Sequence, residues 1–156
     1  MDTVIPRTLA MLDIAAYNGL SSHQDEGARD MVKMISLVYR KKGLSDDEFY
    51  RYWRETHGPM VARLIPFARR YVQNHPEAFP GLTYDADGIV EMWFDSVEDV
   101  QRYLDWRASP EAYDLKEDED RFQDYKKTRR FVVREHEFET TGRQWNPGAN
   151  LPDGPG

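Results

Sequence analysis

Apolar and polar residues alternate along four short segments of the chain, and each segment predicts a β-strand. The segment 31–40 is apolar on both sides, with Ile35 and Leu37 on one side and Val32 and Met34 on the other. A strand has this pattern when one face packs on helices and the other lines an enclosed interior. The four predicted strands are residues 31–40, 69–75, 88–94 and 130–138.

Between the predicted strands, the spacing of apolar residues changes to that of amphipathic helices. Ser45 and Glu48 form a capping box, which satisfies exposed amides at the start of a helix. Ser96 opens a second helical segment, and Ser109 with Pro110 opens a third. The sequence therefore predicts helices in both long connections between strands.

The first helical segment carries a histidine on an aromatic face. Phe49, Trp53 and His57 recur every four residues and so share one side of a helix. Gly58 can end this helix in the left-handed conformation, and Pro59 suits the first turn of the next. We expect His57 at the corner between two short helices, where a structural cap and a functional group are both open interpretations.

The order of elements predicts the fold class. Strand, helix pair, strand, loop, strand, helix pair and strand fit an α+β, ferredoxin-like arrangement, with a four-stranded antiparallel sheet and helices on one face. Because the strands are apolar on both faces, we expect two copies to pair sheet to sheet as a homodimer. Residues 1–30 are expected to be an N-terminal extension, and residues 139–156 an irregular tail rich in Gly, Pro and Asn.

Composition narrows the classes of function. Asp and Glu exceed Lys and Arg by 28 to 21, and a net charge of -7 argues against binding nucleic acid or an anionic membrane. The chain has no cysteine and no apolar run of membrane-spanning or signal-peptide length, so a cytoplasmic protein is expected. No nucleotide-binding or metal-spaced motif occurs, and the acidic run 117–120 is expected to be a solvated helix face. We expect neither a cofactor nor a metal.

Two further strands carry polar side chains that could serve a pocket. Tyr71, Gln73 and His75 fall on one face of the second strand, where they would offer hydrogen-bonding groups if that face lines the interior. Glu91 stands between apolar neighbours on the third strand, so it needs a partner or a solvent-facing position.

The run Phe49, Tyr52, Trp53, His57, Gly58 and Pro59, in the order F-x-x-Y-W-x-x-x-H-G-P, resembles the signature of EthD-like proteins. The resemblance extends over about residues 31–138. It implies a dimeric α/β barrel with a ferredoxin-like fold. It also implies a relation to the small enzymes of aromatic polyketide metabolism, some of which are decarboxylases without a cofactor.

From this resemblance we expect a cofactor-independent decarboxylase of a polycyclic aromatic polyketide carboxylic acid. Such a reaction needs one acid to protonate carbon and donors that hold the carbonyl or phenol oxygen. His57 or His75 is the expected proton donor. Alternatives are an anthrone-type oxygenase, a dehydratase or a cyclase of the same pathway, or an aromatic-ligand-binding barrel without catalysis. The expected substrate contacts are Tyr71, Gln73, Trp53, Tyr39, Glu91 and Trp93.

Overall fold

The alternating segments form one antiparallel sheet. In the computed structural model, which describes residues 31–142, the strand order is β2-β3-β1-β4 and every pairing is antiparallel. This arrangement confirms the predicted α+β, ferredoxin-like fold. The strands are β1 (Val32–Val38), β2 (Ala68–Asn74), β3 (Gly88–Phe94) and β4 (Arg129–Val133).

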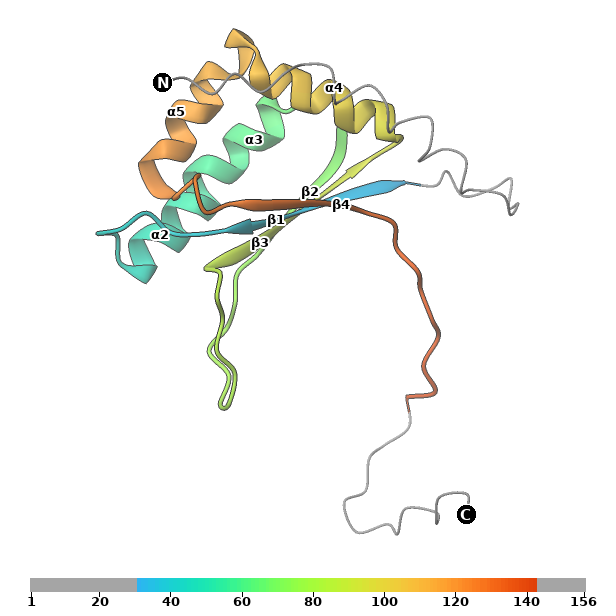
Figure 1. Ribbon diagram of the computed structural model, residues 1–156. Coiled ribbons are helices and arrows are strands. Elements are labelled where there is room, and N and C mark those ends of the chain that lie inside the picture. Colours follow the sequence, from blue (N-terminus) through green and yellow to red (C-terminus); the bar gives the residue numbers. More distant parts are fainter. Residues whose placement is uncertain (1–30, 143–156) are drawn as a thin grey trace, which may run out of the picture.

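All helices lie on one side of this sheet, and no helix within the described residues covers the other face (Figure 1). The β2–β3 connection and the segment that follows β4 extend on the uncovered side. The helical elements are α2 (Asp46–Tyr52), the π-helix η2 (Trp53–His57), α3 (Gly58–Leu64), α4 (Val97–Ala108), the 3-10 turn η3 (Pro110–Ala112) and α5 (Tyr113–Phe122).

The core lies between the helices and the helix-facing side of the sheet. Alternation along β1 and β3 decides which residues reach it, because successive side chains of a strand point to opposite faces. The buried set confirms the predicted faces of these two strands. Burying one such apolar side chain contributes about 1.5–3 kcal/mol to the stability of the folded state. The central buried residues are Val32, Met34, Val90, Met92, Phe94, Phe49, Trp53, Val100, Tyr103 and Phe122.

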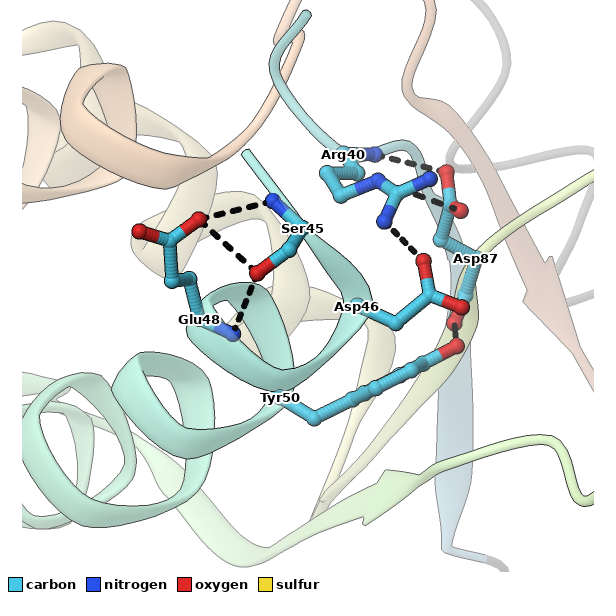
Figure 2. Close-up of polar contacts among 6 residues, drawn as sticks. All are labelled: Arg40, Ser45, Asp46, Glu48, Tyr50 and Asp87. Carbon is cyan, nitrogen blue, oxygen red and sulfur yellow. Dashed lines mark hydrogen bonds and ion pairs between the residues drawn. The ribbon is translucent and has the colours of Figure 1, made fainter. Parts of the chain in front are cut away.

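The start of α2 is held at both the backbone and the side-chain level (Figure 2). The Ser45 hydroxyl accepts a hydrogen bond from the Glu48 amide, and the Glu48 carboxylate accepts from the Ser45 amide, which confirms the predicted capping box. The Tyr50 hydroxyl donates to the Asp87 carbonyl at 2.8 Å, and the Arg40 amide donates to the Asp87 carboxylate at 2.7 Å. These bonds fix α2 against the ends of β1 and β3.

Two predicted segments lie largely outside the described residues. The N-terminal extension 1–30 is outside them entirely, as is the part of the tail from residue 143 onward. Residues 139–142 have no helix or strand. The fourth strand ends at Val133 and so is shorter than the predicted segment 130–138.

Candidate active site

His57 is carried by a single turn of π-helix, where we had expected a break between two helices. Gly58 has a φ of -55° and a right-handed conformation, so α2, η2 and α3 run on without a left-handed residue. The Gly58 amide donates to the carbonyl of Trp53, five residues earlier. Pro59 has no amide proton to donate to the carbonyl four residues before it, which favours an irregular turn here. His57 lies on the buried side of this turn, with only 4% of its surface exposed.

The His57 ring is fixed by a carboxylate from α5. Its Nδ1 lies 2.7 Å from Oδ2 of Asp118, and the Tyr52 hydroxyl donates to Oδ1 of the same carboxylate at 2.6 Å. Because a carboxylate only accepts hydrogen bonds, Nδ1 carries the proton and Nε2 is left with the free lone pair. Among the described residues, no hydrogen-bond partner of Nε2 is found. The histidine is therefore oriented with one nitrogen available for chemistry.

Burial and the Asp118 carboxylate shift the pKa of His57 in opposite directions. Burial lowers the pKa of His57 below the ordinary value of 6.5, although the hydrogen bond with Asp118 acts to raise it. The imidazole is neutral at pH 7 as a result, and Asp118 stabilises the imidazolium that forms when it takes up a proton. This is the electrostatic arrangement of a group that can both accept and return a proton.

His57 faces a narrow cavity between the helices and the sheet. The free space inside is about 30 Å³, enough for water but much less than the roughly 150 Å³ cavity that holds benzene. The walls are mostly aromatic and aliphatic, with several polar groups among them. The lining includes Ser36, Trp53, His57, Ile65, Tyr71, Glu119, Thr128 and Arg130.

The polar row on β2 is only partly in this cavity. Tyr71 lines it, and burial raises the pKa of the Tyr71 phenol to about 12. Gln73 does not line it, because its amide donates to the Trp53 carbonyl at 2.9 Å and to the Tyr71 hydroxyl at 3.2 Å. His75 stacks on Trp53 with ring centroids 4.6 Å apart and lies outside the lining. Gln73 and His75 thus support the wall that Trp53 and Tyr71 present to His57.

Glu91 and Trp93 lie on the opposite face of the sheet from His57. Glu91 pairs with Lys33, Nζ to Oε1 2.9 Å, and this hydrogen bond lowers the pKa of Glu91. Lys33 also lies 4.5 Å from the centre of the Trp93 ring. Tyr39 follows β1, where its carbonyl accepts from the Asp124 amide, and it does not line the cavity either. These three predicted contacts are not brought together with His57.

Two acids of the site were not predicted from the sequence. Asp118 and Glu119 belong to the run predicted to be solvated, but they are 5% and 6% exposed. Glu119 accepts two hydrogen bonds from the buried guanidinium of Arg107, at 2.9 and 2.5 Å. The signal was the helical spacing of Leu115 and Phe122, since residues 118 and 119 complete the i, i+3, i+4, i+7 face that these two define.

Two general findings apply to the described part of the chain. No group of three or more His, Cys, Asp or Glu side chains within residues 31–142 is placed to hold a metal ion. None of the helices in this range combines the length and apolar character that crossing a bilayer requires.

Comparison with solved structures supports the fold. An EthD family protein from Bacillus halodurans C-125 is 22% identical, with a TM-score of 0.53 over 68% of this chain and 99% of that one. At3g17210 from Arabidopsis thaliana is 21% identical, with a TM-score of 0.52 over 77% of this chain and 100% of that one. SnoaB, a cofactor-independent oxygenase from Streptomyces nogalater, is 13% identical with a TM-score of 0.45, over 73% and 99% of the two chains. At 22% and 21% identity, the likeness to the Bacillus and Arabidopsis proteins concerns the fold alone.

Comparison of sequences gives the family. None of the functionally curated proteins compared with this chain matches it. The sequence profile described as the EthD domain matches residues 41–126, which is more than half of the 156 residues and includes Tyr52, His57 and Asp118. The chain belongs to the EthD domain family.

Proposed function

We propose that this protein is a cofactor-independent enzyme that decarboxylates an aromatic carboxylic acid, with His57 as the group that moves the proton. The observation that carries the proposal is the pairing of His57 with Asp118 at the wall of a cavity that Trp53 and Tyr71 also line. A buried histidine whose orientation is fixed by a carboxylate is typical of general acid–base catalysis.

The proposed reaction balances with one proton. The substrate carboxylate leaves as carbon dioxide, and its bonding electron pair remains on the ring or enol system. The His57 imidazolium donates its Nε2 proton to that carbon. The neutral ring then takes a proton from water, and the hydroxide left over combines with the carbon dioxide to give bicarbonate. Asp118 stabilises the imidazolium before the transfer, while the lowered pKa of His57 makes the imidazolium a stronger acid than an ordinary histidine.

The cavity limits how the substrate can bind. Its free space of about 30 Å³ cannot hold an aromatic ring unless wall residues move. The partly exposed members of the wall are Ile65, Tyr71, Thr128 and Arg130. We expect the longer side chains among them, those of Ile65, Tyr71 and Arg130, to move. A polycyclic polyketide acid then fits the proposal if one ring reaches His57 and the remaining rings extend outside.

A panel of aromatic hydroxy acids, from one ring to three, tests the proposal. Mass spectrometry should show products that have lost carbon dioxide with the wild-type protein and not with His57→Gln. His136→Gln is the control, because His136 is exposed and does not line the cavity. Conversion that is equal in wild type and His57→Gln would remove His57 from the mechanism.

A second candidate reaction starts with His57 as a base. The lowered pKa of His57 favours this candidate, because a neutral imidazole is ready to accept a proton at pH 7. Proton abstraction from an aromatic or enolic substrate would then start an oxygenation, a dehydration or a cyclisation. The pH dependence distinguishes the two: kcat falls as pH rises through the His57 pKa if imidazolium is the reactant, and falls as pH decreases if the neutral ring is.

A binding protein without catalysis is the remaining alternative. In that case substitution of His57 would change the affinity for an aromatic ligand, and no product would form with any member of the panel. Calorimetric titration alongside the mass measurements separates this outcome from both enzymatic ones.

We also propose that two copies pair through the uncovered face of the sheet. Ile89 and Phe131 are 38% and 51% exposed on that face, next to the partly exposed Ile35 and Leu37. These exposed apolar side chains lie together beside the Lys33–Glu91 ion pair, and exposed apolar side chains gathered on one face favour association there. Phe131→Glu should therefore give monomers in light scattering, while Leu104→Glu, on the outer surface of α4, should leave the dimer intact. A wild-type protein that is monomeric at high concentration would contradict this proposal.

A further inference from the structure

The cavity has a second polar region contributed by β4 and the residue before it. Arg130 pairs with Ser36 in the β1–β4 ladder, so its side chain starts on the helix-facing side of the sheet. Thr128 lies just before β4 and lines the same cavity. His57, in contrast, enters from η2. A ligand in the cavity would therefore contact groups from two different layers of the fold.

Within the part of the chain that the structure describes, Arg130 is a cation without an acidic partner. Its guanidinium lies over the Tyr125 ring, 4.8 Å from the ring centre. The neighbouring cation, Arg107, is already neutralised by two hydrogen bonds to Glu119. Within residues 31–142, no carboxylate lies within ion-pair distance of Arg130. Arg130 is consequently the cation of this cavity wall whose charge is available to a ligand.

Thr128 supplies an independent observation. Its hydroxyl oxygen is buried and has no hydrogen-bond partner among the described residues. Buried polar groups are almost always paired, because an unpaired one loses its hydrogen bonds to water without compensation. The cavity has polar groups in its wall and is large enough for a water or a ligand atom to satisfy this hydroxyl.

We infer that Thr128 and Arg130 form a subsite for an anionic oxygen of a planar ligand. The inference builds on the proposed function and identifies the part of the substrate that this wall would recognise. The hydroxyl of Thr128 donates one hydrogen bond, and the guanidinium of Arg130 supplies charge-assisted ones. Stacking on Tyr125 limits the positions that the guanidinium can take, so the subsite is partly preorganised.

The chemistry indicates which oxygen uses the subsite during turnover. A cation that held the departing carboxylate would stabilise the substrate more than the transition state and so would slow the loss of carbon dioxide. A ketone or phenol oxygen next to the carboxylate gains negative charge in the same step and is better stabilised there. An enolate or phenolate oxygen is therefore the group that occupies the subsite during turnover. A carboxylate is the other anionic oxygen that the subsite could bind.

Two probes separate these sources. Binding of 4-nitrophenol is followed by the visible absorbance of its phenolate, and binding of benzoate by calorimetry. We expect 4-nitrophenol to bind as the phenolate, with its pKa lowered by the protein, and Arg130→Gln to weaken this binding by about 10-fold to 100-fold. Arg130→Lys should keep part of the affinity, and Thr128→Val should lose a smaller part. Arg63→Gln is the matched control, since Arg63 is exposed on α3.

Each outcome has a defined meaning. Binding of the phenolate alone, or of both probes, with loss in Arg130→Gln supports the subsite, and binding of benzoate alone assigns it to carboxylates. Absence of binding, or binding that is equal in wild type and Arg130→Gln, would overturn the inference. His57→Gln should still bind the phenolate, so turnover that survives this substitution would reject the proposed function while leaving the subsite intact.

Discussion

Oδ2 of Asp118 lies 2.7 Å from Nδ1 of His57, although the two residues are 61 positions apart in the sequence. The contact joins the π-turn of η2 to the middle of α5, and both side chains are almost fully buried. A histidine held in this way has one tautomer and one free nitrogen. Four predictions concern this pair and the structure that supports it.

Asp118→Asn should reduce kcat by about 10²-fold to 10⁴-fold with little change in KM, because an amide can donate to Nδ1 and hold the imidazole in the wrong tautomer. Steady-state kinetics on a converted acid from the panel measures the effect. Asp120→Asn, on the exposed side of the same helix, should behave like wild type. Equal kcat values for Asp118→Asn and wild type would show that the pair is structural.

Tyr52→Phe should raise the pKa of His57. The Tyr52 hydroxyl donates to Oδ1 of Asp118, so its removal leaves the carboxylate a stronger acceptor that stabilises the imidazolium more. We expect unfolding to become easier by about 1–3 kcal/mol as well, because a buried carboxylate oxygen loses its donor. Titration of the His57 ring resonances by NMR checks the first effect. Tyr113→Phe, at an exposed position of α5, is the control and should change neither quantity.

Stability should fall as the solution becomes acidic, in part because of His57. Its pKa in the folded protein is lowered, so below pH 6.5 the unfolded chain binds a proton that the folded chain does not. The stabilisation is complete above pH 6.5 and is lost as pH decreases toward the folded pKa, by about 1.4 kcal/mol for each pH unit in that window. Urea unfolding of wild type and His57→Gln at several pH values measures the difference. His75, whose pKa is also lowered by burial, is present in both proteins and cancels. A difference in stability that is independent of pH would show that the buried imidazole is not responsible.

Gly88→Ala should destabilise the fold by about 1–3 kcal/mol, because a β-carbon at residue 88 would overlap the six-membered ring of Trp53. Thermal or urea unfolding measures the cost. The double variant Gly88→Ala with Trp53→Leu should lose less stability than the two single variants lose in total, since the smaller leucine makes room for the methyl group. Strict additivity would mean that the two residues are not in contact.

Short-range sequence patterns correctly predicted the helix caps and the strand whose structure depends on neighbouring residues. The capping box of Ser45 and Glu48, the hydroxyl cap of Ser96 and the alternation from Gly88 to Phe94 each depend on residues within a few positions of one another. The structure confirms all three. The π-turn was not predicted, because Gly58 and Pro59 are equally compatible with a helix end and with an irregular turn.

The sequence by itself determined the fold class, the burial pattern of the central strands and the presence of His57 on an aromatic helix face. Only the tertiary structure decided which polar groups meet. Asp118 and Glu119 were predicted to be solvated because a run of acids is usually exposed. Nothing near them in sequence shows that His57 comes to hydrogen-bond Asp118 and Arg107 comes to neutralise Glu119. Glu91 and Trp93 lie on the face of the sheet opposite the helices, whereas the cavity lies on the face that the helices cover. Local order follows from neighbouring residues, whereas the pairing of buried charges is set by chain segments that come together only on folding.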